Sequence, residues 1–198
     1  GVIGIAVGTA LLPRISRQIR TGREAESIAD QNRATEGALL LTLPAAVALA
    51  VAAEPIIAVL FARGAFGAHE TTATAAALAA FAAGLPAQVL VKVLSPGFYA
   101  REDTKTPVKI AFFAMLLNAV VAISLMPFIA HVGIAVATSV AGWFNAGMLG
   151  FLLMKRGHFT ADRRLKDRLV RIVGATIAMG LAVLLLDGQG PGVQGLTK

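Results

Sequence analysis

Long stretches without any charged residue constrain this chain more than any other feature. Five of them are long enough, alone or with flanking residues, to cross the roughly 30 Å hydrocarbon core of a bilayer as a helix of about 20 residues. The 198-residue sequence is 57% hydrophobic and 15% charged, whereas soluble domains are about 45–50% apolar and about 25% charged. These values exclude a water-soluble globule and a disordered chain.

The apolar stretches predict helices. Strands of a membrane barrel alternate polar and apolar residues over about ten positions, and no such alternation is present. Alanine-rich runs such as residues 75–83 favour helix over strand. We therefore predict an all-α fold, a polytopic transmembrane helix bundle of about six spans within residues 1–187, followed by a flexible tail at 188–198. The predicted spans cover about residues 1–12, 37–61, 71–97, 107–130, 132–154 and 169–187.

The basic residues predict how these helices are oriented. Fifteen of the 18 lysines and arginines lie in alternate loops, at residues 13–35, 99–109 and 155–171. Because positively charged loops stay in the cytoplasm, these three loops are predicted to be cytoplasmic. The loop at 13–35 has no aromatic side chains between its arginines, so nucleic-acid binding is not expected.

Helix-breaking residues inside the predicted spans are candidate hinges. A proline frees a carbonyl one turn earlier and bends the helix, and bent helices line substrate cavities in transporters. Bends without a mechanical role are also common, so both interpretations stay open. The candidates are Pro44, Gly84, Pro86, Pro96 and Gly97.

Lys92 is a charged residue inside a predicted span, where a charge is costly and is by default a functional hypothesis. The helix is expected to end one turn later, at Pro96–Gly97, so the ammonium group can reach the membrane surface as an anchor. The alternative is contact with an anionic ligand, supported by Gln88 one turn earlier on the same face. Asn118 and Thr138 are expected to lie at similar depth on consecutive helices and to form an inter-helix pair.

Catalytic and metal-binding patterns are not found in the sequence. It contains no cysteine, no carboxylate pair within a span and no phosphate-binding glycine loop with the right spacing. The three histidines, His69, His131 and His158, lack the spacing of metal ligands. We therefore expect neither an enzyme, nor a cofactor, nor a metal site.

Three motifs in this sequence resemble those of one known family. Residues 91–109, VKVLSPGFYAREDTKTPVK, are similar to the pattern VKVL-x-PGFY-x-R-x-D-x-KTPVK. Residues 1–13, GVIGIAVGTALLP, are similar to GV-x-G-x-A-x-GT-x-LLP, and residues 60–66 are similar to LF-x-x-G-x-F. In this order, the three patterns resemble the MurJ (MviN) family of lipid II flippases, within the MOP exporter superfamily.

The resemblance implies an inner-membrane protein of fourteen helices in two lobes. This chain would be a piece running from the end of the eighth helix through the thirteenth, without the N-terminal lobe. The implied activity moves the undecaprenyl-pyrophosphate-linked peptidoglycan precursor, lipid II, to the periplasmic leaflet by alternating access, for peptidoglycan and cell wall synthesis. The motif residues carried over as substrate-path candidates are Lys92, Arg101, Asp103 and Lys105.

Some family members resemble one another in a sodium site, and part of its pattern is present here. Asn118 and Thr138 match two of its positions, whereas Ala122 stands where those members have Asp. The two residues are therefore candidate remnants of an ion site, and sodium coupling is not carried over. Alternatives to a lipid II flippase are an exporter of drugs or O-antigen-type lipid-linked oligosaccharides, or a membrane scaffold that transports nothing.

Overall fold

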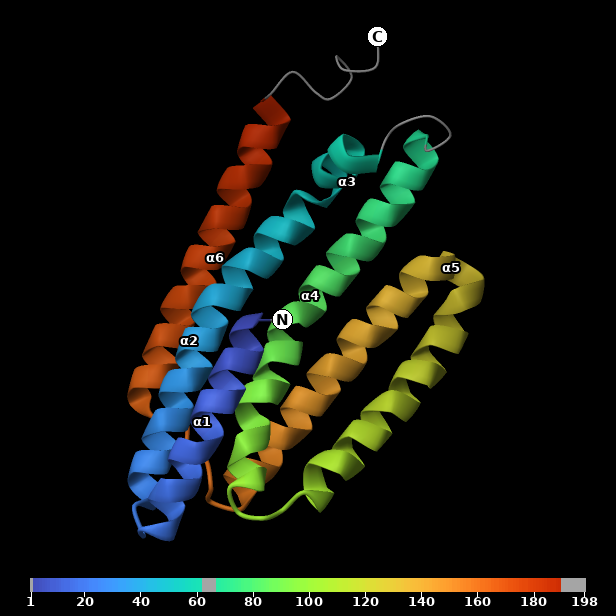
Figure 1. Cartoon of the computed structure of the whole chain (residues 1–198). Helices are drawn as coiled ribbons and strands as arrows, with labels where there is room; N and C mark the ends of the chain where they lie inside the picture. The colour runs from blue at the N-terminus through green and yellow to red at the C-terminus, as the bar shows by residue number, and fades with distance from the viewer. Residues whose placement is uncertain (1, 62–66, 190–198) are drawn as a thin grey trace.

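The computed structural model describes residues 2–61 and 67–189 of the chain, and the described part is helical (Figure 1). Five of its helical segments are long and apolar enough to cross a membrane, at Glu24–Val51, Ala68–Tyr99, Lys105–Ile129, His131–Lys155 and Arg163–Leu185. The predicted all-α bundle of about six spans is therefore confirmed in outline. The helices are α1 (Val2–Arg20), α2 (Glu24–Val51), α3 (Ala53–Phe61), α4 (Ala68–Tyr99), α5 (Lys105–Lys155) and α6 (Arg163–Gln189).

The segment predicted as the loop 13–35 consists mainly of two helix ends. α1 continues through Pro13 to Arg20, and α2 already begins at Glu24. The connection is a tight turn in which Gly22 has φ = 72°, a conformation that favours glycine. Two acidic residues in the first turn of α2, Glu24 and Glu26, suit the positive end of the helix dipole.

The predicted span 37–61 is divided into two helices. α2 ends at Val51, and α3 is a separate helix of nine residues. In Figure 1, α3 lies beside the far end of α2 and packs against α4. Its buried residues are Ala53 and Ile57, whereas Val59 and Leu60 are exposed.

The two spans predicted at 107–130 and 132–154 form one helical hairpin, α5. The backbone stays helical through the reversal near His131, where a loop was expected. Figure 1 shows the chain folding back on itself there, and a Cβ built on Gly133 would lie 2.9 Å from the Cβ of Leu125. Across the hairpin, Asn118 Nδ2 donates to Thr138 Oγ1 at 3.4 Å, which confirms the predicted inter-helix pair.

α4 lies at the centre of the bundle and packs against α1, α2, α3 and α5. One apolar cluster joins α1 and α2 to Val89 and Val93 of α4, and another joins α4 to α5 and α6 around Phe98 and Leu149. α6 packs mainly against α2. It ends at Gln189, two residues into the predicted tail, and the rest of that tail, 190–198, lies outside the described residues.

Candidate functional site

The first half of α2 is the most polar buried part of the described chain. It lies at the basic end of the bundle, by which we mean the end where α1 and α4 finish and α2, α5 and α6 begin (Figure 1). Buried polar groups need hydrogen-bonding or ionic partners. α1, α4 and α6 supply some of those partners, whereas Ser27 Oγ, Gln31 Oε1 and Asn32 Oδ1 have none among the described residues. The buried polar residues of this segment, here called the α2 polar half, are Ser27, Asp30, Gln31, Asn32, Thr35 and Glu36.

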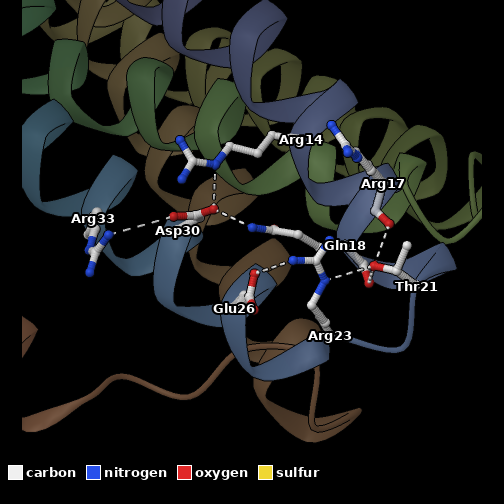
Figure 2. Close-up of polar contacts among 8 residues, drawn as sticks. All are labelled: Arg14, Arg17, Gln18, Thr21, Arg23, Glu26, Asp30 and Arg33. Atoms are coloured by element: carbon white, nitrogen blue, oxygen red, sulfur yellow. Dashed lines mark hydrogen bonds and ion pairs between the residues drawn. The ribbon is translucent and has the colours of Figure 1, made fainter.

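Asp30 joins α2 to α1 through its carboxylate. Gln18 Nε2 donates to Oδ2 at 2.6 Å, and Arg14 Nε is paired to the same oxygen at 2.7 Å (Figure 2). Arg33 Nη1 lies 3.9 Å from Oδ1. The carboxylate is buried and both guanidinium groups are mostly exposed, so one negative charge holds two arginines at the basic end.

Gln31 joins α2 to α4. Its side chain is completely buried, and Nε2 lies 3.5 Å from the carbonyl oxygen of Val93 and 3.4 Å from that of Leu94. A Cβ on Gly97 would lie only 2.7 Å from Nε2 of Gln31. Gly97 is therefore needed for close packing against Gln31.

Asn32 and Glu36 join α2 to α6 and to the segment before it. Asn32 Nδ2 donates to the carbonyl of Thr160 at 2.9 Å. Arg168 Nη1 donates to Glu36 Oε1 at 2.7 Å, and Arg164 Nε lies 3.4 Å from Oε2. The Glu36 carboxylate is buried between the two guanidinium groups.

Arg101 and His158 lie between the helix ends at the same end of the bundle. Arg101 Nη1 donates to the carbonyl of Gly97 at 2.8 Å, whereas its Nε and Nη2 are buried without a partner among the described residues. Burial lowers the pKa of Arg101, and the charge of Glu24 partly opposes this. Burial also lowers the pKa of His158, and the charge of Arg101 adds to that effect.

Asp103 ties the start of α5 to its end. It accepts hydrogen bonds from the backbone N–H of Thr106 at 3.0 Å, from Thr106 Oγ1 at 2.6 Å and from Arg156 Nη1 at 2.5 Å. These bonds, led by that of the Thr106 hydroxyl, lower the pKa of Asp103 from 3.8 to about 2. The guanidinium of Arg156 also lies over the ring of Phe98, 5.6 Å from its centroid, so the end of α4 joins the same cluster.

Lys92 and Lys105, the other two motif candidates, are exposed. Neither ammonium group makes a hydrogen bond or ion pair in the part of the chain that the structure describes. The expectation that the helix ends at Pro96–Gly97 is wrong, because α4 continues to Tyr99. Lys92 therefore lies seven residues, about 10 Å, inside the helix end.

Lys92 belongs to an exposed stripe along α4. Phe81, Leu85 and Gln88 precede it at spacings of four and three residues, and all of them are exposed. This spacing places them on one side of the helix. We call these four residues the open face of α4. Phe81 and Leu85 form its apolar part. The amide of Gln88 and the ammonium group of Lys92 follow towards the C-terminal end of α4.

The candidate hinges have different surroundings. Pro44 is half-buried inside α2, and Pro96 is buried in α4. Gly84 touches α5, since a Cβ there would lie 2.5 Å from Ser139 Oγ. Pro86 is buried two residues further on.

The ion-site candidates form their own hydrogen bonds. Thr138 Oγ1 donates to the carbonyl of Ile134 at 2.9 Å and accepts from Asn118. Among the described residues, no three His, Cys, Asp or Glu side chains lie close enough together to hold a metal ion. The polar groups of the described arrangement can join helices and contact an anionic ligand.

Sequence reasoning missed the α2 polar half. Asp30 and Glu36 are acidic residues among arginines. A loop whose positive charge only orients the helices needs no acidic residues, so these two could have indicated ion pairs. Ser139 and Trp143, which bond to carbonyls of α4, were also missed as contacts to α4. Nothing in their immediate sequence indicates this role.

Comparisons with known proteins agree on one family. The family described as "Lipid II flippase MurJ" matches residues 1–192. The "Probable lipid II flippase MurJ" of Rhizobium tropici is 46% identical over 187 residues, which cover 94% of this chain and 35% of that protein. The "Lipid II flippase MurJ" of Burkholderia cenocepacia is 35% identical, over 90% of this chain and 34% of that protein.

A solved structure gives the same result. "Lipid II flippase MurJ, inward closed conformation" superposes with a TM-score of 0.70 at 26% identity, covering 94% of this chain and 42% of that one. The chain thus spans about a third of the length of its curated relatives. The family match covers nearly the whole chain, and the helical arrangement agrees with it, so this multi-pass membrane chain belongs to the MurJ lipid II flippase family.

Proposed function

We propose that this chain is part of a flippase that carries lipid II across the membrane, a transporter and not an enzyme. The observation that carries the proposal is the family match over residues 1–192. The other part of the transporter would be the remainder of the full-length protein, because the chain covers only 35% of its relative from Rhizobium tropici.

We place the protein in the bacterial inner membrane, with the basic end in the cytoplasm. Fifteen of the 18 lysines and arginines lie in the segments 13–35, 99–109 and 155–171, all of which are at that end. This distribution supports the orientation through the preference of positive segments for the cytoplasm.

The physical task explains why a polar path is needed. A pyrophosphate-linked sugar must cross about 30 Å of hydrocarbon, whereas the lipid tail can stay in the bilayer. In this proposal, Lys92 on the open face of α4 contacts the anionic headgroup, since an ammonium group is a common phosphate ligand. Arg101 and Asp103 join the helix ends at the path's cytoplasmic entrance, and Lys105 adds an unpaired charge there.

The full-length protein can be tested in cells depleted of their own lipid II flippase. Expression of the full-length protein should restore growth and the labelling of lipid II on the outer face of the membrane. Growth without restored labelling would contradict the proposal, and so would correct membrane insertion with neither effect. A transporter of another lipid-linked sugar would insert correctly into the membrane and restore neither growth nor labelling.

The role of Lys92 can be tested in the same cells. Lys92→Ala should lower outer-face lipid II by about tenfold or more, because one charge-assisted contact contributes about 1.5–3 kcal/mol. Lys92→Arg should keep most of the activity. Lys105→Ala is a control for general loss of positive charge and should have a smaller effect. Full activity of Lys92→Ala would make Lys92 a membrane anchor.

A further inference from the structure

The middle of α4 contains two helix-breaking residues, Gly84 and Pro86. Because proline has no backbone N–H, the carbonyl of Ala82 loses its usual donor within the helix. A helix with such a site can bend there, and sequence reasoning treated both residues as candidate hinges. Ala82 and Ala87, on either side of Pro86, are completely buried.

The second half of α5, His131–Lys155, contacts α4 on the N-terminal side of Pro86. Ser139 Oγ donates to the carbonyl of Ala80 at 2.5 Å, and Trp143 Nε1 donates to the carbonyl of Ala83 at 3.0 Å. A Cβ on Gly84 would lie 2.9 Å from the Cα of Ser139. The two backbones are therefore as close as a glycine permits.

The same part of α5 also contacts α4 on the C-terminal side of Pro86. A Cβ on Gly142 would lie 3.6 Å from the Cβ of Ala87 and 2.9 Å from Nε2 of Gln88. α5 therefore contacts α4 on both sides of the proline. A change in the angle of α4 at Pro86 would have to break the contacts on at least one side.

We propose that Ser139 and Trp143 are positioning residues that fix the angle of α4 at Pro86, so that α4 and His131–Lys155 move as one unit during transport. The consequence for transport rests on the proposed function, because it concerns where the open face of α4 points. Gly84 and Pro86 then serve close packing and a fixed shape, and the movement of the transporter takes place elsewhere.

The angle itself can be measured in the full-length protein. Ala76 and Tyr99 are exposed positions of α4 on the N-terminal and C-terminal sides of Pro86. Spin labels at these two positions should give one narrow distance distribution near 35 Å, both with and without substrate lipid. Ser139→Ala combined with Trp143→Phe should add a second, broader population, since each lost inter-helix hydrogen bond shifts such an equilibrium about threefold. Two populations in the unsubstituted protein would overturn the proposal.

A matched control is available in the same helix. Among the described residues, Ser124 Oγ bonds only within α5, to the carbonyl of Val120 at 2.8 Å, so Ser124→Ala removes a serine hydroxyl without touching α4. It should leave the distance distribution unchanged. If Ser124→Ala broadens the distribution as much as the double variant does, the effect is one of general stability and the positioning role is wrong.

A disulfide tests the single moving unit. Ala87→Cys with Gly142→Cys places two Cβ atoms at a distance suitable for a disulfide. The bond should form nearly completely in membranes, and the oxidised protein should transport as well as the same protein after reduction. Loss of transport on oxidation alone, or slow and incomplete bond formation, would overturn the proposal. Absence of lipid II transport by the unsubstituted protein, with complete bond formation in the double variant, would count against the proposed function instead.

Discussion

Asp103 connects three helix ends through one carboxylate, because it caps the start of α5 and pairs with Arg156, which in turn covers Phe98 of α4. Its pKa in the folded protein, about 2, is below its ordinary value of 3.8. The folded state therefore binds the proton less readily than the unfolded state. The stabilisation is complete above about pH 4 and is lost as the pH falls towards 2.

Asp103→Asn should lower the unfolding free energy by about 1 kcal/mol at pH 7, since it removes an ion pair and weakens a helix cap. Thermal unfolding in detergent between pH 2 and pH 7 would also show a flatter pH dependence for this variant. Asp167, which is exposed, provides the control. Asp167→Asn should change neither quantity, and an equal effect of both substitutions would contradict the assignment.

Gly97 lies against the buried ends of the Gln31 and Leu153 side chains. A methyl group there would lie 2.7 Å from Gln31 Nε2 and 3.1 Å from Leu153 Cδ2, so Gly97→Ala should destabilise the protein by about 1–3 kcal/mol. Gly147→Ala, at a helical position with nothing within 4 Å, should be neutral or stabilising. Thermal unfolding of both variants checks this, and Gln31→Ala should partly rescue Gly97→Ala.

At the scale of elements, α6 depends on α2 for its place in the bundle. Glu36→Gln removes the charge that Arg164 and Arg168 share, so backbone amides in the first turns of α6 should exchange with deuterium about fivefold faster. Glu26→Gln, in the same helix, removes an ion pair that is exposed on both sides. It should leave exchange in α6 unchanged, and equal effects would contradict a specific role for Glu36.

The helices that cross the membrane were predictable because their apolar length is a property of each segment alone. α4 and the two halves of α5 follow the predicted spans within a few residues, and the pair Asn118–Thr138 was found from its place on two antiparallel helices. The first half of α2 was taken for a loop. It is helical because α1, α4 and α6 supply its polar partners, and these partners are distant in sequence.

The candidate site was predictable only in part, for the same reason. The motif identified Arg101 and Asp103 and contains the Gly97 carbonyl and Thr106 that bond to them. Arg156, which joins Asp103 to the end of α5, lies 53 residues later in the chain. Gly97 was one of the candidate hinges, and its packing against Gln31, a residue 66 positions earlier in the chain, gave no signal in the sequence. Lys92 was found because a charge inside an apolar stretch can be recognised without any partner.

At the scale of the whole molecule, the proposed orientation predicts which positions reagents can reach. The sequence contains no cysteine. In a full-length protein without other cysteines, a single cysteine introduced into this part of the chain is therefore the one site that a thiol reagent labels. In intact spheroplasts, a membrane-impermeant maleimide should label His69→Cys at the start of α4 and should label Thr104→Cys only after lysis. Both positions are exposed, and the reverse pattern would contradict the orientation.

The α2 polar half also implies an order of assembly. Asp30 is paired by α1, Gln31 bonds to α4, Asn32 to the segment before α6, and Glu36 is paired by α6. These partners leave the ribosome one after another, so each step of synthesis adds a partner for one more buried residue of α2. Glu36 has no ionic partner until the last described helix is made. A chain stopped before Arg163 would therefore leave the Glu36 carboxylate without either of the arginines that pair with it.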